Sequence, residues 1–175
     1  MEDNRKSEFA EAIPFSRAEI AHVLDVPVRT VNNWIDRNQL WQTPRHGYYR
    51  LKDVFDLAGF SALRSANVPE QECARYVRNF GFYRCFLHGD QFSNLSLRDG
   101  KWDIGIYDPS AVVSLRINMR AIGGSIFRRI SELLSADPSD RSAENFENFK
   151  HLYHKAVELD RLWPNSAPLL EDSQQ

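Results

Sequence analysis

The feature that most restricts the fold lies at 16–37, where two short amphipathic segments flank a tight turn. Ser16 is followed three residues later by Glu19, the spacing of a capping box, so a helix is expected to begin there. A turn is predicted at 25–27, because Pro27 suits the entrance of a second helix. The first helix has one narrow apolar stripe, made of Ile20, Ala21, Val23 and Leu24.

The second helix is expected over 28–37, with Val31, Trp34 and Ile35 turned inward at the i, i+3 and i+4 positions. Two short helices joined by a tight turn form a helix-turn-helix, whose second helix enters the major groove of DNA. Arginine pairs with guanine and asparagine with adenine. Polar residues also line ordinary solvated helix faces, but two consecutive exposed asparagines are poor helix formers, which favours a functional role. The outward residues are Arg29, Thr30, Asn32, Asn33 and Arg37.

Two extended segments at 39–43 and 47–51 surround a basic tip and predict a β-hairpin wing. Arg45, His46 and Arg50 in such a wing would contact phosphate or the minor groove, so Arg45→Ala is expected to weaken binding about equally on all sequences. Further helices are expected from residue 51 and over 70–80. The complete set of candidate DNA-binding residues is Ser16, Arg17, Val28, Arg29, Thr30, Asn32, Asn33, Arg37, Arg45, His46, Tyr48 and Arg50.

The distribution of charge matters more than its sum. The formal net charge of −2 is unusual for a nucleic-acid binder, because neutralisation of phosphate supplies most non-specific affinity. Between 26 and 50, however, four arginines face a single acid, Asp36, which gives a local charge of +3. A basic face on an acidic body is the pattern of a specific rather than a promiscuous DNA binder.

The order of these elements resembles the MerR-type winged helix-turn-helix over about 14–80, under half of the chain. The matching positions are Ile20, Ala21, Val26, Thr30, Tyr49, Arg50, Asp53, Val54, Leu63, Arg64, Asn67 and Val68. The segment TVNNWIDRNQL is also similar to the excisionase and terminase-small-subunit branch, which favours a Trp-Ile pair in the recognition helix. The resemblance implies a DNA-binding module.

The chain departs from the family pattern at several positions. Asn32, Asn33 and Trp34 replace an Arg-Tyr-Tyr run, and Asp25 and Asn67 replace turn glycines. Aspartate and asparagine tolerate the left-handed backbone, so the turns are expected to survive. The family's metal-sensing cysteines have no counterpart. The two cysteines of the chain are expected to be free and packed in the core, Cys73 in a helix and Cys85 in a strand.

The second half predicts a small antiparallel β-meander followed by two helices. Strands are expected at 82–88, 92–97, 102–107 and 112–117, because turn residues separate apolar or alternating runs. Asn118 is expected to cap a helix to about residue 134, which Gly123 and Gly124 weaken by about 1 kcal/mol each. Close helix packing explains the glycine pair better than a phosphate loop, since no Lys-Ser/Thr follows.

A last helix is expected over 144–162. It carries His151 and His154, for which surface or interface positions are favoured over a metal site, because no third ligand is evident nearby.

The predicted fold class is therefore α+β, with a flexible arm at 1–13, the winged helix-turn-helix at 14–80, an oligomerisation or sensing domain at 81–163 and a flexible tail at 164–175. The expected function is a homodimeric or higher-order transcriptional regulator of double-stranded DNA. The alternatives are an excisionase-like or packaging-type architectural protein, and a ligand-sensing regulator. An apolar pocket for a small molecule would be lined by Phe82, Tyr83, Phe86, Trp102 and Tyr107, although aromatic residues on strands more often form a core.

No catalytic, metal or cofactor constellation stands out, so an enzyme is not expected. The sequence has no apolar run of membrane-spanning length and no signal-peptide pattern at its start. We therefore expect a cytoplasmic, nucleoid-associated protein without a membrane partner.

Overall fold

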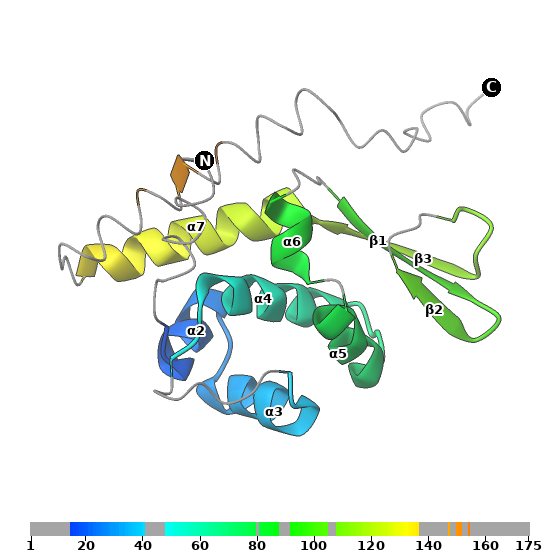
Figure 1. Ribbon diagram of the computed structural model, residues 1–175, viewed down its shortest axis with the longest axis horizontal. Coiled ribbons are helices and arrows are strands. Elements are labelled where there is room, and N and C mark those ends of the chain that lie inside the picture. The colour runs from blue at the N-terminus through cyan, green and yellow to red at the C-terminus, as the bar shows by residue number, and fades with distance from the viewer. Residues whose placement is uncertain are drawn as a thin grey trace.

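The structure, a computed structural model, describes residues 15–40, 48–79, 81–87, 92–104 and 108–136, together with 147, 150, 151 and 154 (Figure 1). Mixed helix and sheet confirms the predicted α+β class. The described elements are α2 (Arg17–Leu24), α3 (Val28–Asn38), α4 (Leu51–Ser65), α5 (Glu70–Asn79), α6 (Phe82–Leu87), β1 (Phe92–Arg98), β2 (Lys101–Ile104), β3 (Val113–Asn118) and α7 (Met119–Ala136).

Helices α2 and α3 begin and end close to the predicted positions. The backbone N–H of Glu19 donates to Ser16 Oγ at 3.2 Å, and the N–H of Ser16 donates to Glu19 Oε2 at 2.6 Å, which confirms the capping box. Asp25 ends α2 in the left-handed region, at φ 57°. Asn67, before α5, also lies there at φ 60°. The two turns therefore form without glycine, as their residue types allow.

Helix α4 is the central helix and packs against α2, α5, α6 and α7 (Figure 1). Its first turn is fixed by Asp53, whose Oδ2 accepts the backbone N–H of Arg50 at 2.8 Å. Nine of its residues are buried, which is why its sequence lacks the one-sided pattern of a surface helix. Its buried residues are Leu51, Val54, Phe55, Asp56, Leu57, Ala58, Gly59, Phe60 and Leu63.

The strand predicted at 82–88 is wrong, because this segment forms α6. Three aromatic residues of this segment are buried in the core: Phe82, Tyr83 and Phe86. Residues with this spacing lie on one face of a helix, whereas a strand would turn Phe82 and Tyr83 to opposite faces. The buried carboxylate of Asp56 accepts the backbone N–H of Tyr83 at 3.2 Å and so satisfies a donor in the first turn of α6. Cys85 consequently lies in a helix and is half-buried.

The sheet is small and antiparallel, as predicted, but it is not a meander. The strand order is β2-β1-β3, so β1 lies in the middle and pairs with both other strands. Leu95 of β1 lies opposite Ile104 of β2 and Leu115 of β3. The third strand returns to the free side of β1 and continues directly into α7, whose backbone at Ala121 donates to the Asn118 side chain at 3.0 Å. The predicted helix cap at Asn118 is therefore confirmed.

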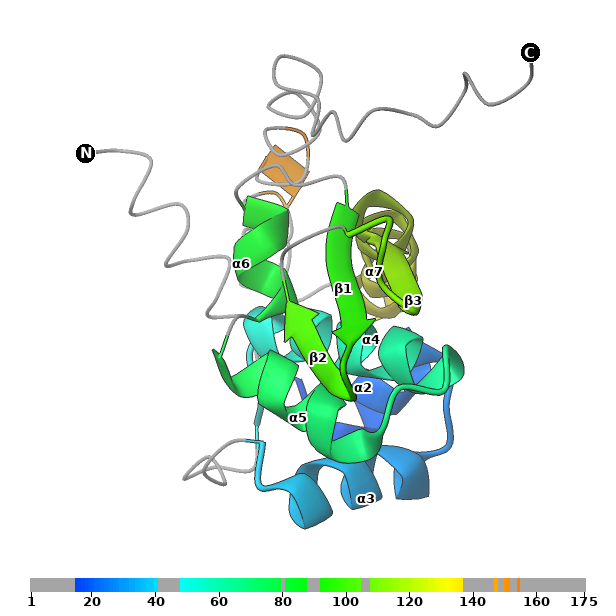
Figure 2. The ribbon, with the colours of Figure 1, turned by 90° about the vertical axis from the view of Figure 1, so that its right-hand side faces the viewer.

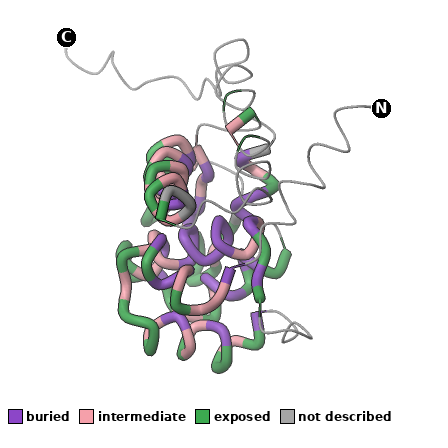
Figure 3. The backbone as a smooth tube through the Cα atoms, turned by 90° about the vertical axis from the view of Figure 1, so that its left-hand side faces the viewer, coloured by how far each residue is buried: buried purple, intermediate pink, exposed green. Residues whose placement is uncertain are grey.

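One buried core joins residues from both halves of the chain. Phe15, Ile20 and Val31 from the first half share it with Met119 and Ile130 from α7. Figure 3 shows the buried positions gathered in the middle of the molecule, with exposed positions around them. The predicted arm at 1–13, the tail at 164–175 and most of the last helix fall outside the described residues; Glu147, Lys150, His151 and His154 are helical.

Candidate nucleic-acid interface

Helix α3 lies at the outer edge of the helical part, on the side away from α7 (Figure 1 and Figure 2). Its inward side is the predicted one: Val31 and Ile35 are buried, and Trp34 packs on Phe60 with ring centroids 5.4 Å apart. The outward residues divide into two groups. Arg29, Asn33 and Arg37 are exposed, whereas Thr30 and Asn32 are half-buried.

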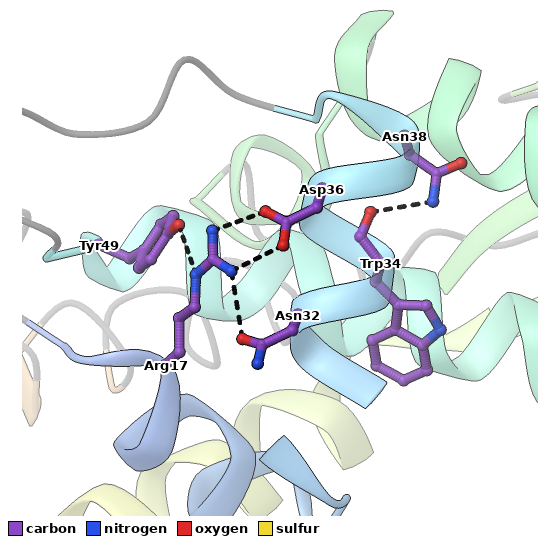
Figure 4. A network of polar contacts seen from close by, with 6 residues as sticks. All are labelled: Arg17, Asn32, Trp34, Asp36, Asn38 and Tyr49. Atoms are coloured by element: carbon purple, nitrogen blue, oxygen red, sulfur yellow. Dashed lines mark hydrogen bonds and ion pairs between the residues drawn. The ribbon is translucent and has the colours of Figure 1, made fainter. Parts of the chain in front are cut away.

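Arg17 connects α2 to the exposed side of α3 (Figure 4). Its guanidinium donates to both carboxylate oxygens of Asp36, at 2.8 and 3.0 Å, and to Asn32 Oδ1 at 3.2 Å. Its Nε donates to the hydroxyl of Tyr49 at 3.0 Å. Two predicted DNA-binding residues, Arg17 and Asn32, therefore hold the two helices together.

This network also changes the charge of the α3 surface. The Arg17 guanidinium holds the pKa of the Asp36 carboxyl below its usual value, and the same hydrogen bonds raise the pKa of Arg17. Asp36 is the one acid of α3, and Arg17 offsets its charge with a fork-like pair of hydrogen bonds. Arg29 and Arg37 consequently lie on a surface whose only carboxylate within the helix already has a partner.

The C-terminal end of α3 and the turn that precedes α3 are attached to distant parts of the chain. At its C-terminal end, the Asn38 amide donates to Glu70 Oε1 of α5 at 2.8 Å, and Arg78 donates to the Asn38 carbonyl at 3.0 Å. At the turn before it, Arg129 of α7 donates to Asp25 Oδ2 at 3.0 Å and to the carbonyl of His22 at 3.1 Å.

Sequence reasoning missed these anchors. The partners lie 32 to 107 residues apart in the chain, and no local pattern connects them.

The remaining candidate residues lie around α3 or outside the described residues. Ser16 serves as the cap of α2, and Val28, the first residue of α3, is 43% exposed. Tyr48 is 54% exposed, and Arg50 is also exposed just before α4.

The tip of the predicted wing, with Arg45 and His46, belongs to 41–47 and lies outside the described residues. At the base of that segment Tyr49 pairs with Phe15, in an antiparallel bridge with N–H to O distances of 2.7 and 2.8 Å.

The aromatic residues predicted to line a ligand pocket do not form one, as far as the structure describes them. Phe82, Tyr83 and Phe86 are at most 3% exposed and pack against Phe55 and Tyr76, so they fill the core as the alternative interpretation proposed. Trp102 packs partly against the same core, and Tyr107 lies outside the described residues.

A hollow of about 210 Å³ lies elsewhere, between α2, α4 and α7. It is lined by Val23, Leu24, Ala58, Ser61, Ala62, Ser65, Ile122, Ser125 and Ile126. Its volume is below the range typical of sites for drug-sized ligands.

Cys73 of α5 is fully buried and packs in the core, as predicted, and this burial raises the pKa of its thiol to about 12. Among the described residues, which include His151 and His154, no three His, Cys, Asp or Glu side chains gather closely enough to hold a metal ion. Within the same part of the chain, no helix combines the length and apolar character needed to cross a membrane.

Comparison with known proteins finds no matching family model, no matching curated protein and no matching solved structure.

Proposed function

We propose that this chain is a sequence-specific binder of double-stranded DNA that regulates transcription, with α3 as its recognition helix. The observation that carries the proposal is the exposed row Arg29, Asn33 and Arg37 on a helix anchored at its C-terminal end, along its side and through the turn that precedes it. Arginine and asparagine can each form two hydrogen bonds to a purine edge in the major groove. A rigidly held helix loses little conformational freedom when it binds.

The spacing of these residues also supports the proposal. Positions 29, 33 and 37 are each four residues apart, so their side chains lie one above another along one side of a helix. Trp34 and Ile35 cover the opposite side and are turned to the core. The surface available to DNA is therefore the side that carries the guanidinium and amide groups.

The proposed module is a MerR-type winged helix-turn-helix, and the proposed assembly is a homodimer. Helix-turn-helix proteins usually bind two half-sites about one helical turn apart, and a dimer presents two recognition helices at that distance. Selection of binding sites from randomised duplexes, followed by footprinting, separates the candidate roles. A palindrome favours a dimeric regulator, whereas a run of direct repeats favours an architectural protein.

The residue-level prediction concerns Arg29 and Asn33. Arg29→Ala and Asn33→Ala should each cost about 1–3 kcal/mol of binding free energy on the selected site and relax the preference at one base position. The matched control is Arg128→Ala, which removes an exposed arginine from α7, away from α3. Fluorescence anisotropy with the selected duplex and with single-base variants measures both effects.

Asn33→Ala also separates a loss of contact from a loss of folding. Alanine is the better helix former by several tenths of a kcal/mol, so this variant should be at least as stable as the wild type while it binds DNA more weakly. If no sequence is enriched, or if Arg29→Ala and Asn33→Ala bind the selected site like Arg128→Ala, α3 is an ordinary solvated helix and the proposal is wrong.

A further inference from the structure

The first turn of α3 presents an apolar side chain to solvent beside its polar ones. Val28 is 43% exposed, although it belongs to a residue type that is usually buried. Among the described residues, the other large apolar side chains that are exposed are Tyr48, Val112 and Val113. Val28 follows Pro27, whose carbonyl accepts the backbone N–H of Thr30 at 2.8 Å, so the helix is already formed where Val28 stands.

The groups available for base contacts in this turn are few. The N-terminal residues of a recognition helix are those that contact base edges. Asn32 is half-buried and accepts a hydrogen bond from Arg17, so its carbonyl oxygen is already used. What remains exposed in the first half of α3 is one apolar side chain, Val28, one guanidinium, Arg29, and one amide, Asn33.

The major groove offers one apolar group that matches Val28. Thymine carries a C5 methyl there, whereas the other base edges present hydrogen-bond donors and acceptors. A donor or acceptor placed against the valine methyls would lose its water without gaining a partner, which costs binding free energy. An open hollow beside Val28, lined also by Ala18, Ala21, His22, Asp25, Val26 and Pro27, leaves its side chain accessible.

We propose that Val28 is a specificity-determining residue that contacts the C5 methyl of a thymine close to the base pair contacted by Arg29. This inference rests on the proposed function, because it assigns a base preference to the same helix. It predicts that the selected site contains a thymine whose methyl group, rather than its hydrogen-bonding edge, is recognised.

Replacement of thymine by uracil tests the proposal without altering the protein. Uracil lacks only the methyl group, so each thymine of the selected site is replaced singly and affinity is measured by fluorescence anisotropy. For the wild type, one replacement should weaken binding about fourfold, the effect of one buried methyl group. Val28→Ala should bind the thymine and uracil duplexes equally well at that position.

The control is Val112→Ala, which makes the same substitution at a more exposed valine, 85% against 43%, in the loop before β3. This control should keep the wild-type ratio of affinities for thymine and uracil. If Val28→Ala also keeps that ratio while the wild type selects a defined site, the proposal for Val28 is wrong and the proposed function stands. If no site is selected at all, the proposed function itself fails.

Discussion

Asp56 is a carboxylate with no exposed surface, enclosed between α4 and α6. Its Oδ1 accepts the backbone N–H of Tyr83, and Lys52 Nζ lies 3.2 Å from its Oδ2. Burial is the largest influence and raises the pKa of this carboxyl above its usual 3.8, although Lys52 and the N–H of Tyr83 act in the opposite direction. The folded protein therefore binds this proton more tightly than the unfolded chain does.

Asp56 should make the stability of the wild type depend on pH in a direction opposite to that of most paired carboxylates. Above the raised pKa, the ionised carboxylate destabilises the fold. As the pH falls through that pKa toward about 3.8, protonation relieves this cost and the wild type gains stability relative to Asp56→Asn. The difference in free energy of unfolding between the two proteins should therefore shift in favour of the wild type on acidification.

Urea unfolding at a series of pH values measures this difference. Asp103→Asn, an exposed substitution on β2, controls for the change in net charge. A difference between wild type and Asp56→Asn that stays constant with pH, or moves in favour of Asp56→Asn on acidification, would contradict the burial account.

Other single-residue features differ in how far the sequence predicts them. Asp25 and Asn67 adopt the left-handed backbone, as expected from residue types that tolerate it. Gln39 adopts it as well, at φ 46°, and ends α3 there, but glutamine has no comparable preference that would mark the position. The exposure of Arg29 and Asn33 follows from helical period. The hydrogen bonds of Arg17 with Asn32 and Asp36 do not follow from helical period, because they depend on how α2 lies against α3.

At the scale of elements, Gly59 sets the distance between α4 and α6. A Cβ added at this position would lie 1.9 Å from Phe82 Cδ2 and within 2.2 Å of two further carbons of the same ring. That ring has no free space to move into, because it is fully buried and stacks on Tyr76 with ring centroids 4.4 Å apart. The glycine is therefore required by close packing and not by a turn.

Gly59→Ala should destabilise the protein by about 1–3 kcal/mol or more, since α6 must move or Phe82 must leave its place. The sign of the change in stability is informative. Alanine is a better helix former than glycine by about 1 kcal/mol, so helix propensity alone predicts that Gly59→Ala stabilises the protein. Chemical denaturation measures the change. Ser65→Ala, at an exposed position of the same helix, should change stability by less than about 0.5 kcal/mol. An increase in stability for Gly59→Ala would show that the close approach of Phe82 is wrong.

The elements that the sequence predicted well are those with a local signal. Capping at Ser16 and Asn118 marked two helix starts, and apolar alternation marked β1 and β3. The segment that became α6 has three aromatic residues in a short apolar run, for which periodicity does not distinguish a strand from a helix. Its helical state depends on Asp56 and Gly59, which are distant in sequence. The strand order depends likewise on where β3 pairs, which no turn signal determines.

At the scale of the whole molecule, the two halves of the chain are held together by side-chain hydrogen bonds and by a shared core. Arg129 connects α7 to the turn before α3, and Arg75 of α5 donates to the carbonyl of Trp102 in β2. Phe82, Met119 and Ile130 belong to the same buried core as the first helices. The sequence suggested a boundary near residue 80 because local patterns change there, but such patterns do not report which apolar faces meet.

A fragment comprising residues 1–80 should therefore fail to fold, whereas the full chain should unfold in one cooperative transition. Removing the second half takes several fully buried side chains from the core, each contributing about 1.5–3 kcal/mol, against a total stability of about 5–15 kcal/mol for a typical domain. Near-ultraviolet circular dichroism and urea unfolding of both proteins provide the measurement. A fragment with native aromatic signals and a cooperative transition would show that the first half is an independent domain.

The Arg17 network has a consequence for any attempt to redirect the protein to a new target. Randomised libraries at positions 29, 33 and 37 would vary side chains that lie on the surface, so many members should fold. Libraries that include 32 or 36 would disturb the partners of Arg17 and, through it, Tyr49. A helix transplanted in place of α3 would thus need compatible partner residues in α2 and in the segment before α4. Under the proposed function, the positions that would read DNA (29, 33 and 37) lie beside the positions that hold the helices together (32 and 36), and only the first set can be exchanged freely.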